Sequence, residues 1–213
     1  MTYDIYVFDM DGTILNTIED ITDATNFAMS KMGYSTYTVN DVKGFVGNGI
    51  RTLIDRAVPE DTSEEDRKKT LAYFMEYYNI HCQDKTGPYP GIIELLTELK
   101  KSGKKLAVVS NKADAPVKLL ADEMFSGLFD VAIGERAGVN KKPARDMVDL
   151  AIETINMPDG RAVYIGDSNV DFETSVNSEL DCILVTWGFR EKEYLKTFNA
   201  KYMVDEPEEI LFV

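Results

Sequence analysis

The feature that most constrains the fold is a regular alternation of apolar, strand-like runs with helical patterns in the second half of the chain. Strands alternating with helices favour a parallel sheet covered on both faces, because each parallel connection needs a crossover. The sequence therefore predicts an α/β fold with a doubly wound parallel sheet. The predicted strands are 105–109, 131–133, 162–165, 182–185 and 202–204, and the predicted helices are 92–101, 114–125, 144–156 and 170–178.

One more strand is predicted at 3–8, but an all-helical block separates it from the others. Apolar residues at helical spacing predict helices at 17–32, after Gly49 and at 63–81. We therefore predict two domains. They are an α/β core of residues 1–15 and 87–213, and a helical cap of residues 16–86 inserted after the first strand.

Charge and cysteine content narrow the class of protein. The net charge of −14 argues against nucleic acids and anionic membranes as partners, because both require basic patches. Cys82 and Cys182 are far apart and form no paired metal-binding motif. The chain shows no secretory leader and no apolar run of about 20 residues, so we expect a cytoplasmic protein. The sequence leaves open whether it is a monomer or a homodimer.

The segment Asp9-Met10-Asp11-Gly12-Thr13 follows the first predicted strand, where ligands of open parallel sheets bind. Side chains two apart in an extended segment point to one side, so Asp9 and Asp11 can face one centre. One can act as nucleophile and the other as proton donor, and a cation between them would relieve their repulsion. Gly12 lets the backbone approach a ligand closely, and the amides after Asp9 could form a concavity that binds an anion, so Gly12 and Thr13 are candidate phosphate-binding residues. An Asp-Gly turn that caps a helix is the structural alternative.

Two further polar segments flank later elements. Ser110 and Asn111 follow strand 105–109 and suit a phosphate oxygen, although both residue types are also ordinary helix caps. Lys142 precedes helix 144–156, and its compact positive charge can balance a phosphate and paired carboxylates. A solvated basic turn is the alternative for Lys142.

The last polar segment contains Asp167 and Asp171, directly after strand 162–165. Asp167 stands at the strand end, and Asp171 lies one helical turn further on. Such acidic sets suit Mg²⁺, which takes one or two carboxylates together with water and phosphate oxygens. We therefore expect Mg²⁺ as the cofactor.

In their order along the chain, these motifs resemble the haloacid dehalogenase superfamily over essentially the whole sequence. The resemblance implies that Asp9 attacks phosphorus and forms an aspartyl-phosphate. It implies that Asp11 protonates the leaving alcohol and then activates water, and that Ser110 and Lys142 hold the phosphoryl group. The implied ligands of Mg²⁺ are Asp9, the backbone carbonyl of Asp11, Asp167 and Asp171.

Within the superfamily, the chain most resembles phosphoglycolate phosphatase-like proteins, through segments 47–51, 87–91 and 108–112. The resemblance implies a phosphatase for a small phosphorylated metabolite, with 2-phosphoglycolate as the expected substrate. Arg51 in the cap either contacts the substrate, for example through a carboxylate, or has a structural or solvated role. The family often has glycine where this chain has Glu179, so the turn there departs from the pattern.

Other functions remain open on the same core. A sugar phosphomutase of the beta-phosphoglucomutase type shares all the core residues but must exclude water. A pyrophosphatase is a second enzymatic alternative. A phosphate-binding regulatory protein without turnover is the non-enzymatic one, and its expected signature is the loss of Asp9 or Asp11, both of which are present.

Overall fold

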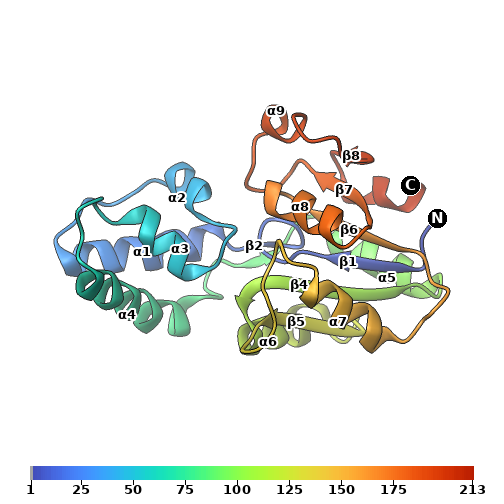
Figure 1. Cartoon of the computed structure of the whole chain (residues 1–213), viewed down its shortest axis with the longest axis horizontal. Helices are drawn as coiled ribbons and strands as arrows, with labels where there is room; N and C mark the ends of the chain where they lie inside the picture. Colours follow the sequence, from blue (N-terminus) through green and yellow to red (C-terminus); the bar gives the residue numbers. More distant parts are fainter. Residues whose placement is uncertain (1) are drawn as a thin grey trace. The chain divides into compact units, whose positions relative to one another are not determined.

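A six-stranded parallel sheet forms the centre of the α/β unit in the computed structural model, which describes residues 2–213 (Figure 1). The strands run in the order β5-β4-β1-β6-β7-β8, and every neighbouring pair is parallel. The predicted doubly wound α/β fold is confirmed. The strands are β1 Ile5–Phe8, β4 Lys105–Ala113, β5 Val131–Glu135, β6 Ala162–Gly166, β7 Asp181–Val185 and β8 Tyr202–Val204.

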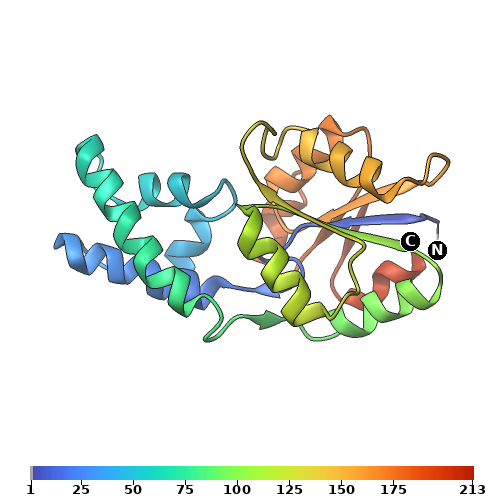
Figure 2. The ribbon, with the colours of Figure 1, turned by 90° about the horizontal axis from the view of Figure 1, so that it is seen from below.

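Helices cover both faces of this sheet, as Figure 2 shows. Tyr6 and Phe8 of β1 pack with α5 and α6 on one face, whereas Ile5 and Val7 pack with α7 on the other. These four side chains are fully buried, which explains why the strand is a continuous apolar run. The helices are α5 Ile92–Lys101, α6 Asp114–Phe125, α7 Asp146–Ile155, α8 Asn169–Asn177 and α9 Lys192–Leu195, followed by the 3-10 helix η1 Pro207–Phe212.

The strand order changes direction at β1. From β1 the chain adds β4 and β5 on one side, and then returns to add β6, β7 and β8 on the other. Ligands of doubly wound sheets bind at such a switch point, beside the carboxyl ends of the strands. The residues that end β1, β4 and β6 therefore lie at the edge of the sheet where a ligand is expected.

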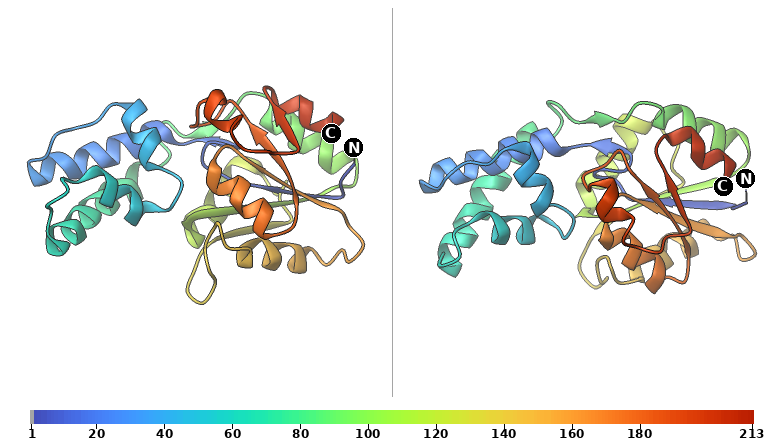
Figure 3. Two further views of the ribbon diagram at one scale, coloured as in Figure 1. Left: turned by 45° about the horizontal axis from the view of Figure 1, so that its top comes forward. Right: turned by 90° about the horizontal axis from the view of Figure 1, so that it is seen from above.

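The helical unit spans Asn16–Gly87, and the α/β unit consists of the chain up to Leu15 together with Pro88–Val213. Figure 3 shows the helices of the helical unit. Helix α2 was not predicted, because its one buried side chain, Val42, gives no apolar period. The capping box between Thr38 and Asp41 is the local signal that marks its start. The helices are α1 Ile18–Met32, α2 Val39–Phe45, α3 Ile50–Ala57 and α4 Glu64–His81.

The two segments that link the units are fastened to each other. Two short strands, β2 Leu15–Asn16 and β3 Gly87–Pro88, pair side by side. Asp20, in the first turn of α1, is 2% exposed and accepts hydrogen bonds from the amides of Lys85 and Thr86 and from the Thr86 hydroxyl. A buried carboxylate needs such donors, so Asp20 fixes the returning chain against α1.

Glu179, the departure noted in the sequence, forms the turn between α8 and β7. It adopts a left-handed backbone with φ 58°, a conformation that usually favours glycine. The amides of Glu179 and Leu180 donate to the carbonyls of Val176 and Ser175, at 3.1 and 2.9 Å. These bonds end the helix as a glycine would, and the side chain costs about 1–2 kcal/mol.

The ends of the described chain lie side by side in the α/β unit (Figure 3). The amide of Thr2 donates to the carbonyl of Val213 at 3.1 Å. Among the helices of residues 2–213, none combines the length and the apolar character needed to cross a membrane.

Candidate active site

The carboxyl ends of β1, β4 and β6 bring the predicted polar residues to one edge of the sheet. Asp9 follows β1, and its amide donates to the carbonyl of Ile165 in β6 at 2.8 Å. Ser110 lies within β4, and Asp167 follows β6. The three are 7%, 2% and 2% exposed, so their polar atoms depend on protein partners or a bound ligand.

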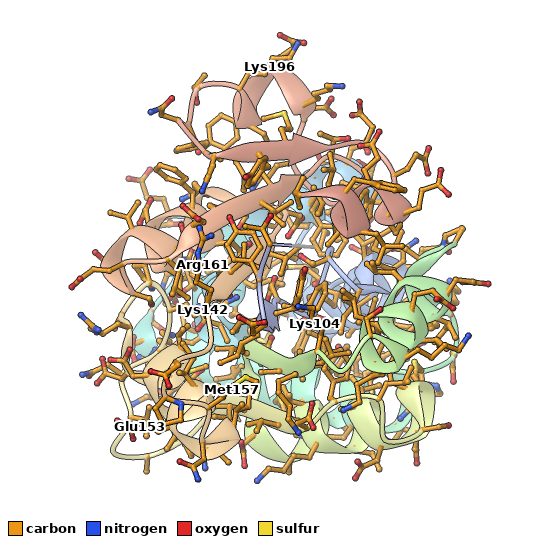
Figure 4. All side chains as sticks on the ribbon, turned by 90° about the vertical axis from the view of Figure 1, so that its right-hand side faces the viewer. Lys104, Lys142, Glu153, Met157, Arg161 and Lys196 are labelled. Atoms are coloured by element: carbon orange, nitrogen blue, oxygen red, sulfur yellow. The ribbon has the colours of Figure 1, made fainter. Side chains whose placement is uncertain are left out.

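Lys142 is the cation at the centre of this edge. Its Nζ lies 2.6 Å from Oδ1 of Asp9, 2.8 Å from Oδ1 of Asp171 and 3.0 Å from the hydroxyl of Tyr164. Its side chain is 2% exposed, and Figure 4 shows it inside the α/β unit, whereas Lys196 reaches the surface. Lys142 is therefore not part of a solvated basic turn.

Three carboxylates gather beside Lys142. One oxygen each of Asp9, Asp167 and Asp171 lies within 4.8 Å of the other two. Asp171 accepts from the amide and hydroxyl of Ser168 at 3.1 and 2.6 Å, and Asp167 accepts from the amide of Phe189 at 2.6 Å. These donors fix the orientation of both acids.

The acids fit a divalent, oxygen-liganded cation such as Mg²⁺. If the groups at this edge are all ionised, four carboxylates stand against three cations, the two lysines that contact them and Arg190, whose charge lowers the pKa of Asp167, so one negative charge remains in excess. A divalent cation would offset that excess and relieve the repulsion between the acids. The groups counted are Asp9, Asp11, Asp167 and Asp171 against Lys112, Lys142 and Arg190.

The pKa shifts also indicate that these acids lack positive charge. Burial raises the pKa of Asp9 well above 3.8, with a further rise from Asp171, and Lys142 only partly opposes this. Burial and the Asp171 charge raise the pKa of Asp167 to about 7. Burial would lower the pKa of Lys142, but Asp171 and Asp9 outweigh it and raise that pKa well above 10.5. Lys142 is thus charged at neutral pH, and the acids still lack positive charge.

The raised pKa of Asp167 predicts a pH dependence of stability in metal-free protein. Between 3.8 and about 7 the folded protein holds a proton that the unfolded chain releases, so stability falls as pH rises through this window. In EDTA we expect a melting midpoint about 5 °C or more lower at pH 8 than at pH 5.5. Asp167→Asn should reduce the difference, and the raised pKa of Asp9 accounts for what remains. A midpoint that rises from pH 5.5 to pH 8 in EDTA would contradict this prediction.

The carboxylate of Asp11 contacts a different lysine from the carboxylate of Asp9. Oδ1 of Asp11 lies 3.0 Å from Nζ of Lys112, at the end of β4, and the two side chains are 15% and 5% exposed. Asp11 does not belong to the group formed by Asp9, Asp167 and Asp171. The predicted pair of acids therefore occupies two adjacent positions, each with its own lysine.

Of the predicted phosphate-binding groups, Ser110 and Asn111 lie at this edge. The hydroxyl of Ser110 accepts from the amide of Lys112 at 3.2 Å, and Nδ2 of Asn111 donates to the carbonyl of Lys142 at 3.0 Å. Asn111 thus links the end of β4 to the segment that carries Lys142, and the hydroxyl proton of Ser110 remains available to a phosphate oxygen.

Gly12 and Thr13 are candidate phosphate-binding residues, and their amides are used within the loop. They donate to the carbonyls of Leu15 and Met10, at 2.9 and 3.3 Å. The amides of Met10 and Asp11 donate to no acceptor among the described residues. The hydroxyl of Thr13 is buried and also lacks a partner in residues 2–213. The groups available to an anion are therefore two of the amides after Asp9, together with the Thr13 hydroxyl.

Two glycines allow the backbone to approach Asp167 closely. A Cβ at Gly12, which has φ 92°, would lie 2.5 Å from Oδ2 of Asp167. A Cβ at Gly188 would lie 2.3 Å from Cβ of Asp167 and 2.5 Å from the carbonyl oxygen of Gly12. The loop after β7 therefore packs directly against the loop after β1, with Asp167 between them.

Arg51 lies in α3 of the helical unit. Its guanidinium is paired with Glu64 at 2.8 Å, and the two side chains are 65% and 57% exposed. The pair lines a small cavity of about 20 Å³ together with Arg67 and Lys68. Within its own unit, Arg51 is thus a surface residue in an exposed ion pair.

Several residues of the site were not predicted. Lys112 was part of a noted segment but was assigned no role, because β4 was expected to end at Val109 rather than Ala113. Tyr164 was hidden within an apolar strand, although a tyrosine hydroxyl in a buried strand needs a partner. The amide of Phe189 has no signal in the sequence, since any non-proline residue has one.

This geometry agrees with the comparison to known families. The family model for haloacid dehalogenase-like hydrolases matches residues 6–185. The chain belongs to this family. The predicted superfamily is therefore confirmed, and as a haloacid dehalogenase-like hydrolase the chain is an enzyme.

Individual relatives extend the similarity over nearly the whole chain. A phosphoglycolate phosphatase from Aquifex aeolicus is 30% identical over 186 residues, 87% of this chain and 85% of that protein. One from Caulobacter vibrioides is 30% identical over 201 residues, 92% and 84% of the two chains. A crystal structure of a candidate phosphoglycolate phosphatase from Lactobacillus delbrueckii subsp. bulgaricus is 40% identical, with a TM-score of 0.94 over 99% of this chain and 97% of that one. The resemblance to phosphoglycolate phosphatase-like proteins is thereby confirmed.

Proposed function

We propose that this phosphatase hydrolyses 2-phosphoglycolate or a closely related small phosphate monoester, with Mg²⁺ as cofactor and Asp9 as nucleophile. The observation that carries the proposal is the buried contact of 2.6 Å between Asp9 and Lys142, beside Asp167 and Asp171. A carboxylate held by a lysine and flanked by a metal-binding acid set is suited to attack a phosphate that the same cations hold.

The proposed reaction has two steps. In the first, a carboxylate oxygen of Asp9 attacks phosphorus as the bond to the leaving oxygen breaks, and Asp11 gives that oxygen a proton. In the second, Asp11 takes a proton from water, which attacks the aspartyl-phosphate and releases inorganic phosphate and Asp9. Two carboxyl groups in different environments can divide these roles, as the separate lysine partners of Asp9 and Asp11 suggest.

The phosphoryl group would be held by groups that lie around Asp9. We propose the Ser110 hydroxyl, Nζ of Lys142 and the amides of Met10 and Asp11 as donors, because each lies at this edge of the sheet. Preorganised donors of this kind stabilise the charge that spreads over the phosphoryl oxygens. The residues predicted to assist are Gly12, Thr13 and Asn111, with Gly12 giving space and Asn111 holding the Lys142 segment.

Mg²⁺ would be held by Asp9, Asp167 and the backbone of Asp11, with Asp171 in direct or indirect support. When bound, it neutralises negative charge on the phosphoryl oxygens and aligns them for attack. The excess of carboxylates over lysines and the raised pKa of Asp167 support this assignment.

We also propose that the helical unit, with the predicted bounds 16–86, acts as a cap that excludes water from the reaction. Arg51 would then bind the carboxylate of the substrate, because its exposed ion pair with Glu64 costs little to open. The names of the curated relatives support 2-phosphoglycolate as the substrate.

The experiment is to measure phosphate release from 2-phosphoglycolate, sugar phosphates, nucleotides and pyrophosphate. We expect a clear preference for 2-phosphoglycolate among them. A preference for pyrophosphate would overturn the proposed substrate, and isomerisation of a sugar phosphate without release would identify a phosphomutase. Binding of the panel without any turnover would identify a regulatory protein.

Removal of the metal should abolish most of this activity. After treatment with EDTA and gel filtration, we expect turnover to fall by about 100-fold or more, because the acids lose the charge that offsets them. Added Mg²⁺ should restore it, and the melting midpoint should rise with Mg²⁺ concentration. Full activity in excess EDTA would contradict the metal assignment without affecting the substrate assignment.

A further inference from the structure

The function proposed so far gives Lys112 no role of its own, although Lys112 contacts Asp11. We propose that Lys112 is a positioning residue that holds the Asp11 carboxyl group at the oxygen of the leaving group. The inference rests on the proposed function, because Asp11 is there the group that protonates that oxygen. It assigns Lys112 to the departure of the leaving alcohol, and not to the binding of phosphate.

Lys112 and Lys142 contact different acids. Nζ of Lys112 lies 3.0 Å from Oδ1 of Asp11, whereas Lys142 contacts Asp9 and Asp171. Asp11 and Lys112 come from the ends of neighbouring strands, β1 and β4. Lys142 therefore contacts two acids of the metal-binding set, and Lys112 contacts Asp11.

Each of the other acids has its own fixed donors. Asp9 has Lys142, Asp167 has the amide of Phe189, and Asp171 has Lys142 and Ser168. For the side chain of Asp11, the donor within the described chain is Lys112. Without it the carboxyl group would be free to rotate, and a misplacement of about 1 Å at a reacting centre can cost about 100-fold in rate.

Stability is a weak explanation for this pair. The Lys112 side chain is 5% exposed, and removing a lysine from water costs free energy that its ion pair only partly returns. Lys105, on the same strand, also pairs with an aspartate, Asp130 at 3.2 Å, but it is 42% exposed. A lysine kept for its charge alone could remain in water as Lys105 does. The buried position of Lys112 is better explained by the orientation that it gives to Asp11.

This role predicts a dependence on the leaving group. Release of an alkoxide requires a proton from Asp11 as the P–O bond breaks, whereas nitrophenolate leaves without one. The value of kcat/KM reports the steps up to transfer of phosphate to Asp9, before Asp11 is needed as a base. Lys112 should therefore affect kcat/KM for an alkyl phosphate much more than for p-nitrophenyl phosphate.

The test compares Lys112→Met with the wild-type enzyme on 2-phosphoglycolate and on p-nitrophenyl phosphate, both in saturating Mg²⁺. We expect kcat/KM to fall by about 100-fold for 2-phosphoglycolate and by less than about fivefold for p-nitrophenyl phosphate. Lys112→Arg keeps the charge, so its kcat/KM for 2-phosphoglycolate should be about tenfold higher than that of Lys112→Met. Lys105→Met is the matched control and should change neither value.

The ratio of the two kcat/KM values is measured on one preparation, so partial misfolding does not alter it. If Lys112→Met does not fold, Lys112→Gln replaces it. In that variant too, kcat/KM should fall more for 2-phosphoglycolate than for p-nitrophenyl phosphate. Equal losses on both substrates would overturn the inference and make Lys112 a phosphate-binding or structural residue. Wild-type enzyme that hydrolyses neither substrate would instead overturn the proposed function.

Discussion

Asp9→Asn is expected to lower phosphate release by about 10³-fold or more, because an amide cannot form the proposed acyl phosphate. The fold should survive, since the substitution removes one negative charge from a crowded acid cluster and leaves Lys142 paired with Asp171. The measurement is kcat on the preferred monoester, together with the melting midpoint in EDTA. That midpoint should be equal to or higher than that of the wild type.

The matched control is Asp122→Asn, an exposed aspartate of α6, which should retain full activity. Mass spectrometry of the Asp9→Asn protein would exclude deamidation back to aspartate as a source of residual turnover. Activity of the variant above about a tenth of the wild-type rate would contradict the assignment of Asp9 as nucleophile.

Gly188→Ala is expected to weaken the binding of Mg²⁺, which is the second-largest effect predicted for a variant. The new Cβ would lie 2.3 Å from Cβ of Asp167 and 2.4 Å from its Oδ2, so the carboxylate or the loop must move. Displacing a group that orients a metal ligand typically costs about 10- to 100-fold in metal affinity. We therefore expect the dissociation constant for Mg²⁺, measured by calorimetry, to rise by this factor.

Gly188 suits this test because its φ lies outside the left-handed region, so alanine adds a contact without backbone strain. Gly44→Ala is the control, because a Cβ at Gly44 would meet nothing within 4 Å. An unchanged Mg²⁺ affinity in Gly188→Ala would show that the loop after β7 does not position Asp167.

The architecture was predictable because the central strands are buried on both faces. Strands such as β1 and β6 are apolar at almost every position, and glycine or acidic residues mark their ends. The same logic located Asp9 and Asp167, since polar residues at the carboxyl end of a buried strand have few structural explanations. Helix α2, by contrast, buries only Val42, so the sequence contained no apolar period to reveal it.

The partners of the site residues were less predictable than the residues themselves. Asp9 and Asp11 were expected to face one centre, but the Asp11 carboxylate contacts Lys112. Contacts across strands, such as that between Asp11 and Lys112, depend on where β4 ends. Backbone donors such as Phe189, and the close approach of Gly188, depend on loop conformation, which residue types do not specify.

The stereochemical course at phosphorus tests the covalent mechanism most directly. A substrate carrying a chiral thiophosphate would be hydrolysed in isotopically labelled water, and the configuration of the released phosphorothioate determined. Two in-line displacements, first by Asp9 and then by water, predict retention of configuration. Inversion would show a single direct attack by water and would contradict the aspartyl-phosphate.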